Sequence, residues 1–380
     1  MNKCIEGSHA VAETINLCRP KVIAAYPITP QTHIVEDLAK MKANGDGGYE
    51  FVRCESEFAA ASIILGASAS GVRVYSASSS QGLLLMTEVL FTIAGMRLPA
   101  VLTCANRAIS APINIWNDQQ DAMTLRDSGW IMLFAEDNQE AVDLHIVAYK
   151  ITEALRIPVM VNMDGFVLTH TFEPVDIPEQ KEVDAFLPEY SPEQGQFLDI
   201  NMPVSLGCFA TPADYMNIRE ELAIDIEASK KFIKTQLGNY KKAFGRGGNA
   251  LVEYYGAKNP DVIIVAMGSV VGTIKDAADE LMEKKKNVGL AKIKCLRPFP
   301  KEELVKVLGK TKFAAVLDKS ISLGQEGILA TEVKAAAQNK LSAKIQSFVV
   351  GLGGRDITKD SIKEIFQHVQ KRDSGLSFVE

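Results

Sequence analysis

The sequence predicts an α/β protein with two units that each contain a parallel sheet. Short apolar runs alternate with longer amphipathic segments over the first 165 residues, and a smaller version of this rhythm returns after residue 250. The short runs are continuously apolar, as in strands that are buried on both faces. Because strand–helix–strand repetition implies right-handed crossovers, we expect helices to cover both faces of each sheet.

We expect the first unit to alternate strands with helices. The expected strands span residues 21–25, 50–54, 72–76, 100–104, 131–134 and 158–162. The expected helices span residues 30–41, 57–69, 83–95, 119–127 and 139–155.

The chain changes character in its middle. Residues 175–212 are rich in Pro, Glu and Gln with little periodicity, and such long excursions usually cover a site or embrace a partner. A helix is expected over 213–243, and the glycines at 245–248 indicate a boundary near residue 250. We therefore expect one domain over 1–245, with the excursion and helix at 165–245, and a second α/β domain over 250–380. The second domain has expected strands at 261–267, 289–295, 313–317 and 345–350.

Composition excludes several classes of protein. The 380 residues are 47% apolar and 23% charged with a net charge of −6, which is ordinary for a globular protein. No basic stripe favours nucleic acid, and no apolar run approaches the ~18 residues that a membrane helix needs. The N-terminal segment lacks the apolar stretch of a signal peptide, so we expect a cytoplasmic protein.

The cysteines and histidines do not form a recognisable ligand motif. The six cysteines include no C-x-x-C pair and the five histidines include no H-x-x-x-H pair. We therefore expect reduced thiols, and we expect this chain to hold neither a metal ion nor an iron–sulfur cluster by itself.

A proline-bound threonine follows the first expected strand. Thr29 lies between Pro27 and Pro30, which fix the backbone around it. One interpretation makes Thr29 the cap of the next helix and Pro30 its first residue, and the sequence alone favours this. The other uses position, because loops at the carboxyl ends of parallel strands bind ligands in open α/β sheets. The Thr29 hydroxyl would then meet a substrate carboxylate.

Glu57 follows the second expected strand in the same way. Ser56 suits the N-cap of the next helix, and an acid in the first turn suits the helix dipole. Phe58 and an alanine-rich helix follow, so the Glu57 carboxyl group is also placed to hydrogen-bond a ring nitrogen of a ligand. The spacing leaves both interpretations open.

Two more polar segments follow strand ends. Residues 76–82 are small and polar, which permits either close approach of a ligand or an ordinary turn. Arg107 follows the strand through Cys104 and precedes the uncharged stretch 108–117. Its guanidinium fork suits a carboxylate or a phosphate.

These motifs occur together in an order that resembles the 2-oxoacid:ferredoxin oxidoreductases, and most closely the alpha subunits of the pyruvate enzymes (pyruvate synthases). The ordered motifs are YPITP at 26–30, Ser56-Glu57, SQGLLLM at 80–86, Arg107-Ala108, residues 118–121, LRPFP at 296–300 and GLGG at 351–354. The resemblance implies a thiamine diphosphate pyrimidine-binding-type domain followed by a smaller, transketolase C-terminal-like domain.

The resemblance also implies roles for individual residues. Glu57 matches the glutamate that contacts the pyrimidine ring of the cofactor, and Thr29 and Arg107 match residues that hold the substrate carboxylate. The remaining matches lie in loops near the cofactor, namely Pro27, Ile28, Ser80, Gln81 and Gly82.

The family's division of labour implies partners. Thiamine diphosphate would be shared with a beta subunit that holds the diphosphate and Mg²⁺. Gamma- and delta-type subunits would carry the [4Fe-4S] clusters that pass electrons to ferredoxin. Residues 45–48 of this chain begin like a magnesium motif but lack its downstream asparagine and precede a strand, so we expect a turn there.

The implied reaction is oxidative decarboxylation of pyruvate with coenzyme A to acetyl-CoA, CO₂ and reduced ferredoxin, or its reverse. Branched-chain, aryl or dicarboxylic 2-oxo acids are alternatives within the family. A thiamine-dependent dehydrogenase beta chain has a similar plan, but the ordered YPITP and SQGLLLM motifs argue against it. The remaining alternative is a non-catalytic binding or scaffold subunit that kept the fold, and intact Thr29, Glu57 and Arg107 argue against that.

Overall fold

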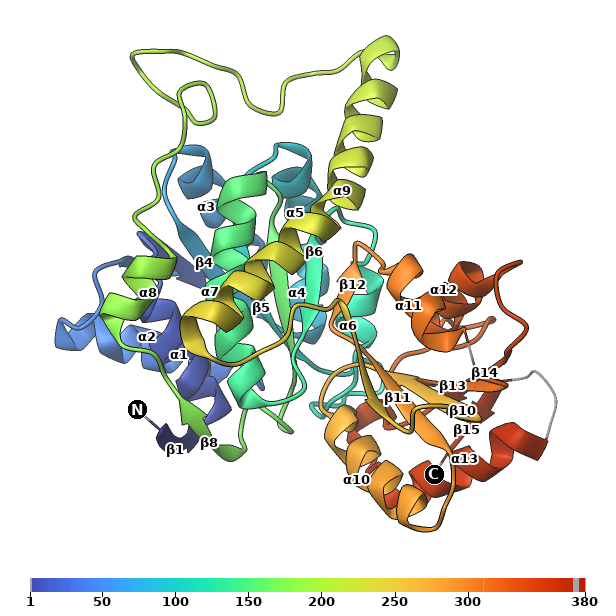
Figure 1. Cartoon of the computed structure of the whole chain (residues 1–380). Helices are drawn as coiled ribbons and strands as arrows, with labels where there is room; N and C mark the ends of the chain where they lie inside the picture. Colours follow the sequence, from blue (N-terminus) through green and yellow to red (C-terminus); the bar gives the residue numbers. More distant parts are fainter. Residues whose placement is uncertain (1, 310, 372–375, 380) are drawn as a thin grey trace.

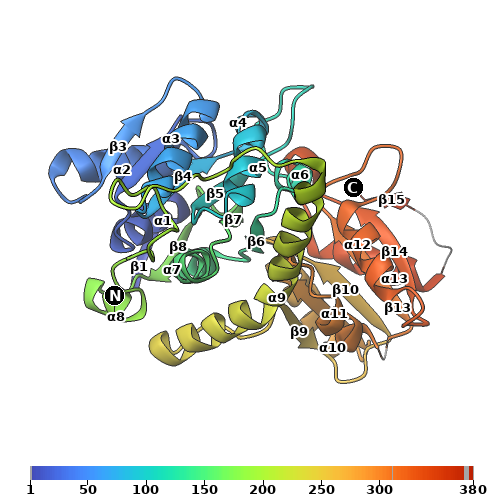
Figure 2. The same ribbon diagram turned by 90° about the horizontal axis from the view of Figure 1, so that it is seen from above.

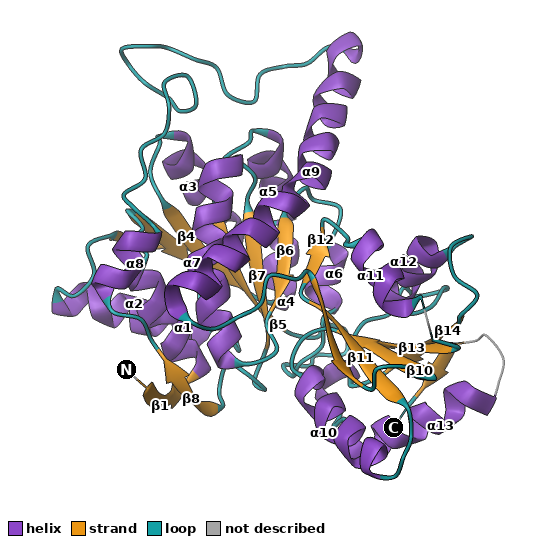
Figure 3. Cartoon of the chain, viewed as in Figure 1, coloured by secondary structure: helices purple, strands orange, loops and turns teal. Residues whose placement is uncertain are grey.

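The computed structural model describes residues 2–309, 311–371 and 376–379. Two sheets of mainly parallel strands dominate it, which confirms the predicted fold class (Figures 1 and 3). The larger has the order β12-β6-β7-β5-β4-β2-β3, in which only β12 is antiparallel to its neighbour. Its strands are β2 (Val22–Ala25), β3 (Glu50–Arg53), β4 (Val74–Ser78), β5 (Val101–Asn106), β6 (Ile131–Phe134), β7 (Val159–Asp164) and β12 (Cys295–Arg297).

Helices cover both faces of this sheet because its strand residues alternate between two apolar clusters. Ile131 and Leu133 join the cluster under one helical layer, whereas Met132 and Phe134 join the cluster on the other face. The first layer contains α1 (Gly7–Leu17), α2 (Thr32–Asn44), α7 (Asn138–Leu155) and the C-terminal half of α9 (Pro212–Phe244). The second contains α3 (Glu57–Ala69), α4 (Ser80–Leu85), α5 (Thr87–Gly95) and α6 (Gln120–Thr124).

The second sheet has the order β15-β14-β13-β10-β11-β9, with only β9 antiparallel to its neighbour. Its strands are β9 (Val252–Gly256), β10 (Val262–Ala266), β11 (Val288–Ile293), β13 (Phe313–Asp318), β14 (Lys344–Val349) and β15 (Leu376–Phe378). Helices α10 (Val270–Glu283) and α13 (Lys359–Lys371) cover one face, and α11 (Lys301–Leu308) and α12 (Ile328–Ala337) cover the other. A short helical turn, η1 (Leu352–Gly354), follows β14.

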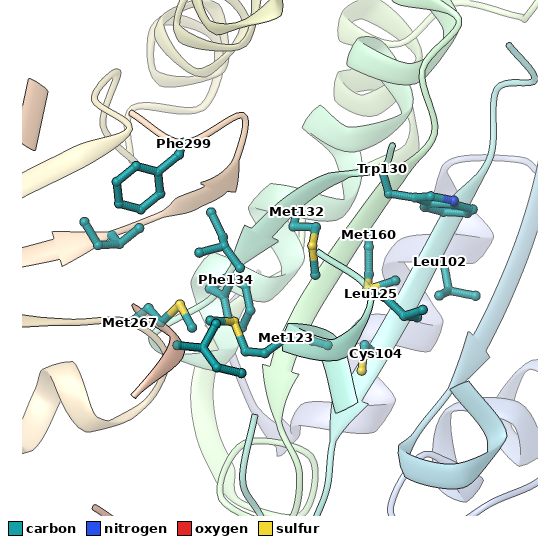
Figure 4. Packing of buried hydrophobic residues seen from close by; sticks show 14 of the residues in the cluster. Leu102, Cys104, Met123, Leu125, Trp130, Met132, Phe134, Met160, Met267 and Phe299 are labelled. Atoms are coloured by element: carbon teal, nitrogen blue, oxygen red, sulfur yellow. The ribbon is translucent and has the colours of Figure 1, made fainter. Parts of the chain in front are cut away.

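The two units share one apolar cluster. Met267 and Phe299 from the second unit pack toward Phe134 and Met123 of the first (Figure 4). The predicted strand at 289–295 is in fact two strands, because the chain leaves β11 in the second sheet and pairs as β12 with β6 of the first. The boundary near residue 250 stays a prediction, and β12 ties the two sheets together across it.

Several elements differ from the sequence-based expectation. The predicted helix at 83–95 begins earlier, at Ser80, and is divided at Met86 into α4 and α5. The antiparallel pair β1 (Asn2–Glu6) and β8 (Phe172–Asp176), the short helix α8 (Gln180–Phe186), and α1 were not predicted. They are short, or they lie next to polar segments that lack a clear period.

Helix α9 confirms the helix expected over 213–243. Its buried side chains begin at Leu222, and its first turns are exposed together with most of the preceding loop. Figure 1 shows that part extending beyond α3 and α5, and in Figure 2 the loop crosses over these helices. In the described part of the chain no helix has the length and apolarity to cross a bilayer.

Candidate functional site

The site predicted from the sequence lies along the carboxyl edge of the first sheet. β2, β4 and β5 lie next to one another in this sheet, and β3 flanks β2. The loop 26–31 follows β2, α3 follows β3, α4 follows β4, and Arg107 follows β5. Parallel strands therefore bring the four motifs to one edge, as open α/β sheets do at ligand sites.

Glu57 is the first residue of α3 and is only 6% exposed. The Ser56 hydroxyl caps this helix by accepting a hydrogen bond from Ala59 N at 3.2 Å, so capping does not occupy the Glu57 carboxyl group. Within the part of the chain that the structure describes, this carboxyl group makes no hydrogen bond or ion pair. A nearly buried acidic residue whose carboxyl group makes no such contact is uncommon in a folded protein, and its carboxyl group is available to a ligand.

Gly82 brings α4 against Glu57. A Cβ atom added at Gly82 would collide with the Glu57 carboxyl group and would lie 2.7 Å from Ser78 Oγ. Only glycine therefore lets the carboxyl group keep its position.

Two side-chain atoms in the residues just before Gly82 are buried and without partners in the described structure. They are Ser78 Oγ and Gln81 Nε2. The sequence-based prediction named Gln81 and Ser80 but not Ser78. The Ser80 hydroxyl is already used, because it donates to Ala108 O and lies 2.6 Å from Gln81 Oε1.

Arg107 and Thr29 come together as predicted, through the backbone. Arg107 Nη1 donates to Thr29 O at 2.8 Å, and Arg107 Nε donates to Asn114 O at 3.0 Å. No salt bridge among the described residues includes Arg107, so three of its five N–H groups remain for a ligand. Burial lowers the Arg107 pKa, although Asp121 opposes this effect.

Thr29 does not cap α2, which corrects the interpretation that the sequence alone favoured. The helix begins at Thr32 and its N-terminal flank is Gln31. Residues 28–31 form a turn instead, closed by Gln31 N donating to Ile28 O at 2.8 Å. The buried Gln31 side chain donates to Ala77 O of β4 at 2.6 Å and anchors this turn. Thr29 and Pro27 are exposed and Ile28 is half-buried, so this loop presents its side chains to a ligand or a partner.

Asp121 holds the Ser80 and Arg107 loops at fixed positions. Its buried carboxylate accepts from Ser80 N at 2.9 Å, Arg107 N at 3.0 Å and Asn106 Nδ2 at 3.0 Å. Ser80 has a φ of 50°, so this acceptor helps to fix an uncommon backbone conformation. Burial raises the pKa of Asp121, and these hydrogen bonds oppose that shift.

The second unit supports the Arg107 loop. Asn114 Nδ2 donates to Gly353 O at 3.0 Å, and Gly353 N donates to Asp118 Oδ2 at 3.2 Å. Nearby, the buried Asp164 at the end of β7 pairs with Lys319 at 2.9 Å. The GLGG motif therefore serves to position the loop between Arg107 and Asp118.

The expected turn lies at the start of the segment 45–48, where Asp46 N donates back to Met41 O at 2.9 Å. Gly45 ends α2 in the left-handed conformation with a φ of 86°.

Comparison with known proteins identifies the family of this chain. Residues 13–236 match the family described as "Pyruvate flavodoxin/ferredoxin oxidoreductase, thiamine diP-bdg", and residues 260–362 match "Pyruvate:ferredoxin oxidoreductase core domain II". The chain is 49% identical to pyruvate synthase subunit PorA of Methanocaldococcus jannaschii, over 97% of this chain and 95% of that protein. It is 42% identical to ketoisovalerate oxidoreductase subunit VorA of Pyrococcus horikoshii, over 98% of this chain and 94% of that one.

A solved structure shares the fold over both units. A 2-oxoglutarate:ferredoxin oxidoreductase from Magnetococcus marinus, with 2-oxoglutarate, coenzyme A and succinyl-CoA bound, matches with a TM-score of 0.76 at 20% identity. The match covers 97% of this chain and 65% of that longer chain. The chain belongs to the pyruvate flavodoxin/ferredoxin oxidoreductase family.

Proposed function

We propose that this chain is the alpha-type subunit of a thiamine diphosphate-dependent 2-oxoacid:ferredoxin oxidoreductase that acts on pyruvate and coenzyme A in the cytoplasm. The observation that carries the proposal is the Glu57 carboxyl group, which is nearly buried and lacks a partner among the described residues. The relatives named pyruvate synthase support pyruvate as the substrate.

Glu57 and the unpartnered polar atoms on the segment before Gly82 fit the pyrimidine end of thiamine diphosphate. That ring system carries both donors and acceptors, and Ser78 Oγ and Gln81 Nε2 are buried groups in need of such partners. Thiamine diphosphate, when bound, supplies the carbon nucleophile and the electron sink for decarboxylation of a 2-oxo acid. Glu57 would hold the proton that is shared with a pyrimidine ring nitrogen. Gly82 keeps that carboxyl group in place.

Arg107 and Thr29 would bind the substrate anion. The N–H groups of Arg107 that the backbone does not use can pair with a carboxylate, and the exposed Thr29 adds a hydroxyl from the facing loop. Because the negative charge leaves as CO₂, Arg107 contributes mainly to substrate capture before the bond breaks.

A partner subunit would complete the site. Large apolar side chains remain exposed on the elements that carry it, including Tyr26 (38%), Phe58 (41%) and Leu85 (51%). A beta subunit that holds the diphosphate and Mg²⁺ would cover them. Gamma- and delta-type subunits would then carry the [4Fe-4S] clusters and pass electrons to ferredoxin.

A branched-chain 2-oxo acid is the second candidate substrate, because a ketoisovalerate oxidoreductase subunit is 42% identical over 98% of this chain. The deciding experiment purifies the native complex, identifies its subunits and assays a 2-oxo acid panel with coenzyme A and a low-potential acceptor. We expect the highest kcat/KM with pyruvate. A higher kcat/KM with 2-oxoisovalerate than with pyruvate would show that the branched-chain 2-oxo acid is the substrate.

The isolated chain provides a separate test of the shared cofactor site. We expect it neither to bind thiamine diphosphate tightly nor to turn over, because no segment of its sequence matches a diphosphate–magnesium motif. Micromolar cofactor binding together with pyruvate decarboxylation by the lone chain would contradict the shared site.

A further inference from the structure

Three segments that are distant in the sequence bring Glu6, His33 and His170 together. Glu6 ends β1, His33 lies in the first turn of α2, and His170 follows β7. One ligand atom of each residue lies within 4.8 Å of the others. The structure assigns these three side chains as ligands of a divalent transition-metal ion of the zinc class. This site lies beyond the proposed function and departs from the sequence-based expectation that this chain holds no metal ion.

The donor set suits zinc. Two imidazoles and one carboxylate with an open fourth position form a known type of zinc site, with ligand atoms about 2.0–2.2 Å from the metal. Ligand atoms around a tetrahedral ion of that size lie roughly 3.4 Å apart. His33 Nδ1 is now 2.7 Å from Glu6 Oε1, and the His33 and His170 ring centroids are 4.6 Å apart. Small side-chain rotations would therefore bring all three ligand atoms to bonding distance.

His170 is oriented as metal-bound histidines usually are. Its Nδ1 lies 2.7 Å from Thr169 Oγ1, which also accepts from Phe166 N at 2.7 Å. A histidine that binds a metal through one nitrogen commonly donates the other N–H to an oxygen. With Nδ1 directed at Thr169, Nε2 remains for the ion.

The surroundings hold the cluster while leaving it accessible. The centroid of the Phe166 ring lies 4.6 Å from that of the His170 ring and 4.6 Å from that of the Trp116 ring. The side chain of His33 is 45% exposed and that of Glu6 is 18% exposed, so an ion can enter. A bound ion would tie β1 and α2 to the turn after β7, close in sequence to the Thr29 loop.

A second histidine cluster provides a matched control. His9 lies 3.0 Å from Asp37 and 3.1 Å from Glu13, but Glu13 also pairs with Lys3 at 2.8 Å. This cluster has one imidazole, and a lysine already neutralises one of its carboxylates. We therefore do not expect it to bind zinc.

The test uses the full chain after treatment with EDTA and desalting. Zn²⁺ is titrated calorimetrically, and Co²⁺ is added as a spectroscopic probe. We expect one ion per chain, a higher melting temperature with Zn²⁺, and Co²⁺ d–d absorption typical of nitrogen and oxygen ligands. His33→Gln and His170→Gln should each weaken Zn²⁺ binding at least 100-fold, Thr169→Val about tenfold, and His9→Gln not at all.

Circular dichroism shows whether each variant folds, and Glu6→Gln replaces any histidine variant that does not. Unchanged Zn²⁺ affinity in a folded His170→Gln chain would overturn the assignment. So would the absence of saturable binding to the wild-type chain, or an equal loss of binding in His9→Gln.

Discussion

Both sheets carry a buried carboxyl group at their carboxyl edge, and the two groups are used differently. Asp318 ends β13 and accepts from Leu329 N at 2.6 Å and from Ala330 N at 3.0 Å, at the start of α12. Glu57 also lies at a helix start, but Ser56 caps that helix and the Glu57 carboxyl group is left without a partner among the described residues. The comparison indicates that a carboxyl group whose hydrogen bonds are all made within the fold, such as that of Asp318, serves stability. A carboxyl group that does not cap its helix, such as that of Glu57, is available to a ligand.

Among the substitutions that test this difference, Glu57→Gln should reduce turnover the most. We expect kcat of the reconstituted complex to fall about 10³-fold, because an amide cannot exchange the proton that a carboxyl group shares with the cofactor ring. Stability should change by at most about 1 kcal/mol, since only a helix-dipole contribution is lost. Pyruvate-dependent reduction of a low-potential acceptor and thermal unfolding measure the two effects.

Glu55→Gln is the matched control for Glu57→Gln. Glu55 is exposed two residues earlier, so the same chemical change should leave kcat near the wild-type value. Near-normal turnover of Glu57→Gln would instead assign Glu57 to helix stabilisation alone.

Arg107→Ala should have the next largest effect. We expect KM for the 2-oxo acid to rise strongly and kcat/KM to fall by a factor on the order of 10², with cofactor content little changed. Arg107→Lys should rescue only part of this loss, because lysine lacks the planar fork. Substrate kinetics, cofactor content and melting temperature are measured on one preparation. Lost assembly with an unchanged KM would show that Arg107 only holds the loop through Thr29 O and Asn114 O.

Gly82→Ala should have an intermediate effect. The added methyl group would collide with the Glu57 carboxyl group, so we expect kcat to fall about tenfold and cofactor occupancy to decrease. Gly66→Ala in α3 is the matched control, because a Cβ atom there meets nothing within 4 Å. Equal kinetics of the two variants would contradict the contact between Gly82 and Glu57.

The sequence predicted which segments meet at the carboxyl edge of the sheet, but not which of their polar atoms have hydrogen-bond partners. Glu57, Arg107 and Gly82 follow strand ends that apolar periodicity locates, so their convergence was predictable. Whether a hydroxyl has a partner depends on the direction of its side chain and on neighbours from other strands. The sequence therefore could not show that the Ser80 hydroxyl is bonded while Ser78 Oγ lacks a partner among the described residues.

Contacts between distant segments escaped the sequence analysis for a related reason. The apolar run at 289–295 does not reveal that Cys295 enters the first sheet, because both strands are buried. Glu6, His33 and His170 share no motif, since only the fold brings them together. The Thr29 cap was wrong because a buried glutamine, Gln31, closes a turn before the helix begins.

Asp318→Asn should have the smallest effect on turnover and should change stability instead. Burial raises the pKa of Asp318 to about 7 from 3.8, although the N–H groups of Leu329 and Ala330 oppose the shift. Between these values the native state keeps a proton that the unfolded chain releases, so the free energy of unfolding decreases as pH rises from about 4 to 7. The contribution lost is at most about 4 kcal/mol, at 1.36 kcal/mol per pH unit.

An asparagine does not titrate, and its NH₂ group faces one of the two N–H donors, so the variant should be less stable by about 2 kcal/mol at pH 4. Denaturant unfolding of both chains across pH 4 to 7 should give a flatter profile for the variant, and parallel profiles would contradict a proton held on Asp318.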